Sequence, residues 1–254
     1  QLSLIIAFTF GTVIGSFLNV VAFRRINNES FIYGRSKCPR CDKRLAWYDN
    51  VPILSFLILK GRCRRCENPI QIFYPIVELI TGILTMTLYK YQPNDPQLLF
   101  CLLCIGYLLI IMALIDFFEK NVYTDHLAIL LLVTLILMII SKGLTFDVLI
   151  GSAAFGGFFL LLRLVGSMIY QREAVGLGDV QLGFVIGIAL QWQDVVLALY
   201  ITFISASFVG AYMIYQKKAK DGELPLIPFI SAGFMVALTH GPQIRGLLRF
   251  LYYG

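Results

Sequence analysis

The chain has 254 residues, of which 58% are hydrophobic and only 14% are charged. Soluble domains carry about 25% charged residues, so this chain has too little polar surface for a soluble globular protein. Its long apolar runs instead predict an all-α, polytopic membrane protein, because helices satisfy their own backbone hydrogen bonds in lipid. The formal net charge of +6 does not indicate nucleic-acid binding, since the basic residues lie in loops and report membrane orientation.

The first apolar run, residues 2–23, is too long for a cleavable signal peptide and has no basic region before it. We therefore expect it to be the first transmembrane helix. Gly11 and Gly15 form a small-xxx-small pair within it, which predicts close packing against another helix. Asn19 is interpreted as a hydrogen-bonding group in this packing rather than as a catalytic residue.

Residues 24–71 form the one long polar segment. Of the 21 Lys and Arg residues in the chain, eleven lie here: Arg24, Arg25, Arg35, Lys37, Arg40, Lys43, Arg44, Lys60, Arg62, Arg64 and Arg65. The positive-inside rule places this segment in the cytoplasm and the N-terminus outside. Within it, residues 51–59 are apolar but too short to span a bilayer, so they either lie on the membrane or pack on the loop itself.

Two CxxC pairs, Cys38 with Cys41 and Cys63 with Cys66, are separated by 21 residues in this polar segment. Paired knuckles of this kind predict one Zn²⁺ ion held by four thiolates. Four cysteines leave no coordination position for a catalytic water, so we expect a structural zinc that folds a small cytoplasmic subdomain. A disulfide framework is disfavoured in a reducing compartment.

The apolar runs predict about eight transmembrane helices in all. After residues 2–23 they cover residues 72–89, 98–115, 127–141, 146–170, 180–190, 194–215 and 224–238. The expected organisation is a first helix (1–23), a cytoplasmic zinc-binding loop (24–71), a transmembrane core (72–240) and a tail (241–254). Arg163 lies near the end of one of these helices and is counted as intramembrane.

Two aspartates at the ends of apolar runs form the candidate catalytic pair. Asp116 follows the run 110–115, and Asp179 closes the sequence Gly176-Leu177-Gly178-Asp179. The count of membrane crossings places both on the cytoplasmic side, as a shared site requires. Two adjacent carboxylates share one proton, so the ionised one can activate water while the other donates to a peptide carbonyl. Asp125 competes with Asp116 for this role, but its surroundings look like an ordinary helix entry.

Three further residues are expected to support this pair. Gly176 and Gly178 are expected to permit unusual backbone angles and to leave room for an extended substrate backbone. Glu78 lies one turn into the second apolar helix, where a carboxylate is costly. It either pairs with a loop arginine or lines the active site, and pairing is the preferred interpretation.

The order of these motifs resembles that of the type IV prepilin peptidases over about residues 11–240. The resemblance rests on the double CxxC loop and on four motifs, namely Gly15-Ser16-Phe17-Leu18-Asn19-Val20-Val21, Tyr74-Pro75 with Glu78, Ala113-Leu114-Ile115-Asp116 and Gly176-Leu177-Gly178-Asp179-Val180-Gln181-Leu182. Two departures, Thr124 and Gln181, stand where the family usually has Pro and Lys, and they put substrate preference in doubt rather than the reaction. The proline-rich stretch of the family resembles residues 225–228.

This resemblance implies an enzyme of the bacterial inner membrane that cleaves the short leader of prepilins and pseudopilins on the cytoplasmic side. It also implies that Asp116 and Asp179 are the catalytic pair. Many members of the family further methylate the new N-terminal amine with S-adenosylmethionine. The expected partners are therefore prepilin substrates and the lipid bilayer, with no nucleic acid. A membrane transporter or scaffold with a zinc docking loop is the alternative, because transporters also use intramembrane aspartates and broken helices.

Overall fold

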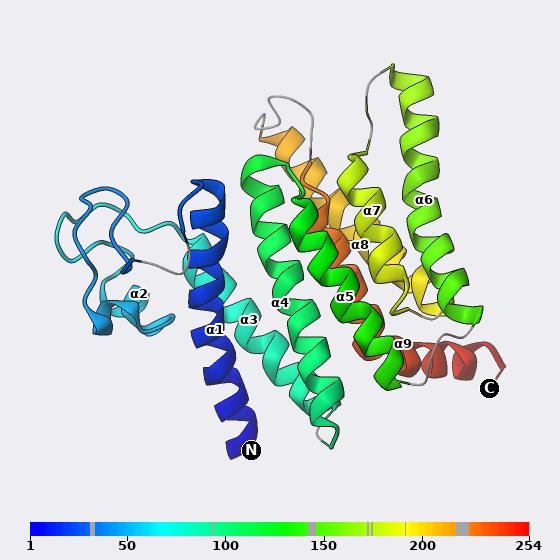
Figure 1. The fold of residues 1–254 in the computed structure, drawn as a ribbon, viewed down its shortest axis with the longest axis horizontal. Coiled ribbons are helices and arrows are strands. Elements are labelled where there is room, and N and C mark those ends of the chain that lie inside the picture. The colour runs from blue at the N-terminus through cyan, green and yellow to red at the C-terminus, as the bar shows by residue number, and fades with distance from the viewer. Residues whose placement is uncertain are drawn as a thin grey trace. The chain divides into compact units, whose positions relative to one another are not determined.

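The computed structural model describes residues 1–30, 34–92, 94–141, 146–171, 173, 175–190, 192–216 and 224–253. The predicted loop lysines at 142, 217, 218 and 220 and Arg172 lie outside these residues. The chain divides into two compact units, residues 1–99 and 100–254. Each unit is described by itself (Figure 1).

The first unit is built on two helices, α1 (Leu2–Ile26) and α3 (Phe73–Tyr91), which pack against each other. A side chain at Gly11 would place its Cβ 2.8 Å from the Thr81 carbonyl oxygen, and one at Gly15 would lie 2.8 Å from the Cα of Glu78. The two helices therefore approach through their glycines, as the small-xxx-small pair predicts. The polar segment between them contains a short 3₁₀ helix, η1 (Trp47–Asn50), and the five-residue helix α2 (Leu54–Ile58).

The second unit contains six helices within the described residues. They are α4 (Pro96–Glu119), α5 (Thr124–Ser141), α6 (Phe146–Tyr170), α7 (Leu177–Gly187), α8 (Trp192–Tyr215) and α9 (Ile227–Tyr253). Helix α7 packs on α6, and α8 packs on α9. The α6–α7 contact is close, because a Cβ at Gly187 would lie 2.8 Å from the Cα of Ser152. Phe155, Phe159 and Phe234 are fully buried in this core.

The all-α fold is confirmed for the described part of the chain, where the only β pairing consists of the isolated bridges Lys37–Arg44 and Arg62–Pro69. Every predicted transmembrane segment is helical. Within the described residues, five helical segments are long and apolar enough to cross a bilayer, namely Leu2–Ile26, Pro96–Glu119, Thr124–Ser141, Phe146–Ile169 and Trp192–Tyr215. The chain is thus a multi-pass membrane protein, but the predicted count of eight spans is not confirmed. With 11 residues, α7 rises only about 16 Å, too short for a bilayer.

Several helix boundaries differ from the prediction by a few residues, and the differences in α7 and α9 are the most informative. Helix α7 begins at Leu177 rather than at residue 180, because Asp179 accepts a hydrogen bond from the N–H of Gly176 and so caps the helix from within. Helix α9 continues through the predicted tail to Tyr253. Pro242 lies inside α9, where it removes a backbone hydrogen bond, and the helix bends before its C-terminal end (Figure 1).

Candidate active site

Asp116 lies in the last turn of α4 and is only 6% exposed. Its Oδ2 accepts a hydrogen bond of 3.0 Å from the backbone N–H of Ile227, which is 111 residues away in sequence. The backbone N–H of Leu226 also interacts with this carboxylate. Ile227 is the first residue of α9, whose first N–H groups have no partner within the helix. The N-terminus of α9, with its positive dipole end, therefore holds the Asp116 carboxylate.

Asp179 lies in the first turn of α7 and is partly buried. Its Oδ2 accepts a hydrogen bond of 3.2 Å from the backbone N–H of Gly176. The carboxyl group of Asp179 is also close enough to Asp116 for the two charges to interact. The second unit therefore brings together the two aspartates that the sequence singles out, one from the end of α4 and one from the beginning of α7.

This pair can perform acid–base chemistry on a water molecule. A negative charge on one carboxylate disfavours ionisation of the other, so a pair of this kind can hold one proton between its two members. Each carboxylate has one oxygen fixed by a backbone N–H, from Ile227 for Asp116 and from Gly176 for Asp179. Such fixed donors hold the reacting groups in place before substrate arrives, which is how a site avoids reorganisation during the reaction.

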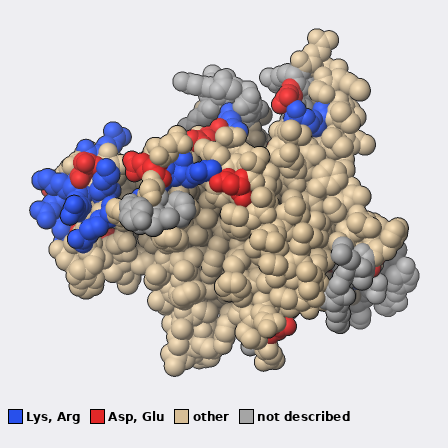
Figure 2. Space-filling view, viewed as in Figure 1, with Lys and Arg blue, Asp and Glu red and all other residues tan. Residues whose placement is uncertain are grey.

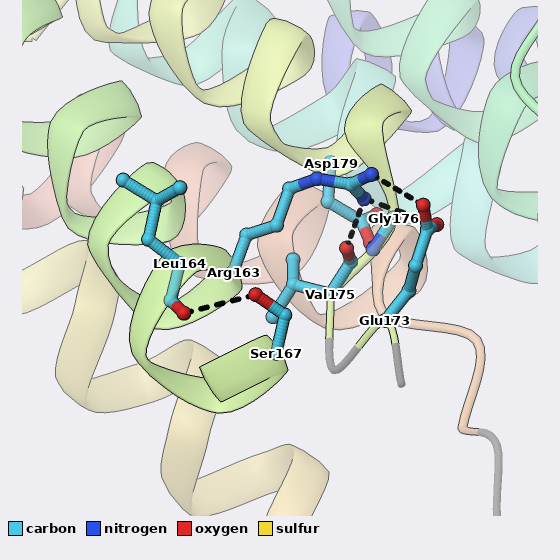
Figure 3. Close-up of polar contacts among 7 residues, drawn as sticks. All are labelled: Arg163, Leu164, Ser167, Glu173, Val175, Gly176 and Asp179. Carbon is cyan, nitrogen blue, oxygen red and sulfur yellow. Dashed lines mark hydrogen bonds and ion pairs between the residues drawn. The ribbon is translucent and has the colours of Figure 1, made fainter. Parts of the chain in front are cut away.

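A basic residue on α6 fixes the segment that leads into Asp179 (Figure 3). Nη1 of Arg163 donates 2.6 Å to the carbonyl oxygen of Val175, and Nη2 lies 2.6 Å from Oε1 of Glu173. The sequence alone predicts nothing for Arg163 beyond its place near a helix end. The only signal that could have drawn attention to it is a cation placed in an otherwise apolar helix, which requires a partner.

The two glycines of the motif have ordinary backbone angles, unlike those predicted. Gly176 has φ −63° and ψ 146°, which any residue can adopt, and Gly178 lies within α7, so the prediction of unusual backbone angles is wrong. A Cβ at Gly178 would clash with the side chain of Val122, so this glycine permits close packing against the segment between α4 and α5. At Gly176, atoms of Asp179 are the only ones among the described residues within 4 Å of an added Cβ.

The four loop cysteines form a compact cluster. The Sγ atoms of Cys38, Cys41, Cys63 and Cys66 all lie within 4.8 Å of one another. Thiolates about 2.3 Å from one ion in tetrahedral geometry would lie at similar separations. This donor set fits a metal ion.

The two knuckles have the same backbone structure. The N–H of Cys38 donates to the carbonyl oxygen of Lys43 at 3.0 Å, and that of Cys63 donates to Asn68 at 2.9 Å. Asp42 and Glu67 occupy equivalent positions and have φ of 55° and 57°. The two CxxC pairs therefore form matching halves of one site.

The surroundings of the cluster favour thiolate at one cysteine. The backbone N–H of Asn68 donates to the Cys66 sulfur and lowers the pKa of Cys66 to about 6. At Cys41 the backbone N–H of Lys43 acts in the same direction, but desolvation and the neighbouring thiols outweigh it and raise the pKa to about 11. A cation at the centre of the cluster would stabilise all four cysteines as thiolates and offset the repulsion among them.

Comparison with known proteins identifies the family. A model described as the type IV leader peptidase family matches residues 101–214. A second model, the bacterial peptidase A24 N-terminal domain, matches residues 9–91. The chain is 32% identical to a Legionella pneumophila protein over 83% of this chain and 74% of that relative. The chain belongs to the type IV leader peptidase family. The predicted resemblance and the prediction of a peptidase are therefore confirmed, and the transporter or scaffold is disfavoured.

Two other relatives lead to the same family. The chain is 36% identical to a Myxococcus xanthus protein over 82% of this chain, although it spans only 62% of that relative. It is 31% identical to a Bacillus subtilis protein over 94% of this chain and 95% of the relative. All three relatives are named prepilin leader peptidase/N-methyltransferase. No solved structure matches the chain.

The two other acidic residues that the sequence considers for the site, Asp125 and Glu78, each have a partner in the structure. Asp125 has 54% of its side chain exposed, and its Oδ1 lies 3.2 Å from Nδ1 of His126. Glu78 lies in the first unit, where its Oε2 accepts a hydrogen bond of 2.7 Å from the backbone N–H of Ile53. The loop thus does provide a partner for Glu78, but the donor is a backbone N–H rather than the predicted arginine.

Proposed function

We propose that this chain is an aspartyl endopeptidase that removes the leader peptide of type IV prepilins and pseudopilins. The proposal rests on the interaction between Asp116 and Asp179 in one unit, with one oxygen of each held by a backbone donor. The names of the relatives supply the substrate class. The proposed location is the bacterial cytoplasmic membrane, with the site facing the cytoplasm.

The two carboxylates divide the work of hydrolysis. Two N–H groups at the N-terminus of α9 face Asp116, so we assign it the negative charge, and Asp179 the proton. Asp116 takes a proton from water as the water oxygen attacks the scissile carbonyl carbon, and Asp179 donates its proton to the carbonyl oxygen. The tetrahedral intermediate then breaks its C–N bond while the leaving amine receives the proton held by Asp116. The proton on the intermediate's hydroxyl returns to Asp179 and restores the pair.

The metal-binding and methylating functions complete the proposal. The four-cysteine cluster is proposed to hold a structural Zn²⁺ ion, since four thiolates leave no open position for catalysis. Methylation of the new N-terminal amine, with S-adenosylmethionine as the methyl donor, is proposed from the names of the relatives.

Processing of a co-expressed prepilin tests the peptidase. Wild type and Asp125→Ala should remove the leader, whereas Asp116→Ala and Asp179→Ala should leave the precursor intact at equal membrane levels. Asp125 is the matched control, because it is a nearby aspartate with an exposed side chain. Leader removal by either Asp116→Ala or Asp179→Ala would contradict the assignment.

A further inference from the structure

The short helix α2 has two different faces. Its outer face carries large apolar side chains that are strongly exposed: Leu54 at 57%, Leu57 at 63% and Ile58 at 73%. On the other side, Ser55 and Phe56 line a cavity of about 740 Å³ within the first unit. Soluble domains seldom expose several neighbouring apolar side chains without a partner. We therefore expect the outer face of α2 to contact an apolar environment.

The position of α2 along α1 places it at membrane depth. Ile53, immediately before α2, is tied to Glu78 by the 2.7 Å hydrogen bond. Glu78 packs directly against Gly15 of α1. Gly15 precedes the end of α1 at Ile26 by eleven residues, or about 16 Å along the helix. Because α1 is one of the candidate membrane spans, the start of α2 lies well inside the depth of that span.

The backbone at this point is held in an unusual conformation. Ile53 has φ 60° and ψ −51°, which is unfavourable for a β-branched residue. Such a conformation persists only where the surroundings hold it, and the buried Glu78 carboxylate is the group that does so here. Irregular backbone at membrane depth is tolerated where it lines a water-filled cavity. The cavity beside α2 meets this condition, since its lining includes Arg24, Arg44 and Asp49.

The chain directly after α2 is strongly basic. Lys60, Arg62, Arg64 and Arg65 follow the helix and are all exposed. Lys and Arg side chains gather on the surface of this part of the first unit, with a few acidic side chains among and beside them (Figure 2). An apolar helix face beside a cluster of cations is the pattern of segments that insert into an anionic membrane surface.

We propose that α2 is a re-entrant segment that enters the bilayer with Leu54, Leu57 and Ile58 among the acyl chains. The basic residues that follow it bind anionic lipid headgroups. The inner face of α2 closes a polar cavity that extends from the zinc-binding loop to the depth of Glu78. The loop between α1 and α3 is thus partly a membrane element rather than wholly a cytoplasmic one.

Quenching of tryptophan fluorescence by brominated lipid tests this placement in the full-length protein. The chain has two tryptophans, so Trp192→Phe leaves Trp47, which is 79% exposed next to α2, as the only reporter. A second reporter, Leu57→Trp in a Trp47→Phe/Trp192→Phe background, lies on α2 itself. In vesicles of acyl-brominated phosphatidylcholine, we expect the Leu57→Trp reporter to lose fluorescence and to resist quenching by iodide from the water.

A matched control places the reporter in the first CxxC knuckle of the loop. Arg40→Trp, in the same background, sits at the exposed tip of the first knuckle and should be quenched by iodide and not by bromine. If Leu57→Trp and Trp47 behaved like the Arg40 reporter, whether because water or protein surrounds α2, the re-entrant placement would be wrong. The headgroup preference is tested in vesicles that mix phosphatidylglycerol with phosphatidylcholine, with only one of the two lipids brominated and the bromine content kept equal. The Leu57→Trp reporter should be quenched more when the phosphatidylglycerol carries the bromine than when the phosphatidylcholine does. Equal quenching would overturn the binding of anionic headgroups.

Discussion

Arg163 donates a 2.6 Å hydrogen bond to the carbonyl oxygen of Val175, one residue before Gly176, the N-cap of α7. The same guanidinium forms an ion pair with Glu173, but 72% of the Glu173 side chain is exposed, against 20% for Arg163. Exposed ion pairs contribute little, because water screens them. The bond to Val175 is therefore the stronger link between α6 and the segment that presents Asp179 (Figure 3).

Arg163→Gln should lower kcat by about 10- to 100-fold, because a hydrogen bond from a charged donor is worth about 1.5–3 kcal/mol. KM should change less, because Arg163 orients Asp179 and is not expected to bind substrate. Glu173→Gln should have a much smaller effect. Ser167→Ala is the control, since the hydroxyl of Ser167 donates to the Leu164 carbonyl within α6 and not to the segment that leads into Asp179. Steady-state kinetics on a prepilin peptide would measure this, and equal losses for Arg163→Gln and Glu173→Gln would contradict the ranking.

Ile227→Pro should remove the N–H that faces Asp116 without breaking α9, because proline is accepted at the first position of a helix. The loss of one hydrogen bond to a charged carboxylate predicts a decrease in kcat of about 10- to 100-fold. Ile227→Ala provides the control, since it also shortens a fully buried side chain but keeps the N–H. If the two variants lost the same activity, packing rather than the hydrogen bond would explain the effect.

Gly178→Ala should reduce both stability and activity, because the new Cβ would clash with Cγ2 of Val122 and lie 2.6 Å from its Cβ. Overpacking of this kind costs about 1–3 kcal/mol. The double variant Gly178→Ala/Val122→Gly removes the clashing atoms and should recover part of the melting temperature. Gly157→Ala is the control, since nothing lies within 4 Å of its added Cβ. A failure of the double variant to recover would show that the contact with Val122 is not the cause.

Removal of a cluster ligand should release the metal and lower stability without removing the catalytic groups. Cys66→Ser is expected to lose bound zinc, measured by elemental analysis, and to melt at a lower temperature. Cys104→Ser, in α4 and outside the cluster, should keep both. Unchanged metal content in Cys66→Ser would contradict the zinc assignment.

The stability provided by Cys66 should depend on pH in one direction. This is tested on protein freed of metal by a chelator, in which the pKa of Cys66 in the folded state is lowered from 9.0 to about 6, so the folded state favours the thiolate. That contribution is complete above the ordinary thiol pKa and is lost as the pH falls towards 6. The difference in melting temperature between wild type and Cys66→Ser should therefore shrink from pH 9 to pH 6, in a thermal-shift series over that range. A difference that grows as the pH falls would contradict this.

The sequence predicts the helices well, because most apolar runs are long enough to indicate a membrane helix by length and composition alone. It also singles out Asp116, Asp179 and the four cysteines, since these residue types stand in recognisable spacing. It could not predict that the N–H of Ile227 faces Asp116, because this contact joins segments 111 residues apart through a backbone group that every residue carries. The contact between Gly178 and Val122 is hidden for the same reason, since tertiary packing alone brings a valine against that glycine.

The central claim, that Asp116 and Asp179 act as one catalytic unit, is tested most directly by the rates of three variants. The variants are Asp116→Asn, Asp179→Asn and the double variant. Each should be purified and reconstituted, shown to melt at the same temperature as wild type, and then compared with wild type on a prepilin peptide. Each single variant should lose as much activity as the double variant, because groups that act together are strongly non-additive. Appreciable activity in one single variant, or losses that multiply in the double variant, would show that the two aspartates do not form a catalytic pair.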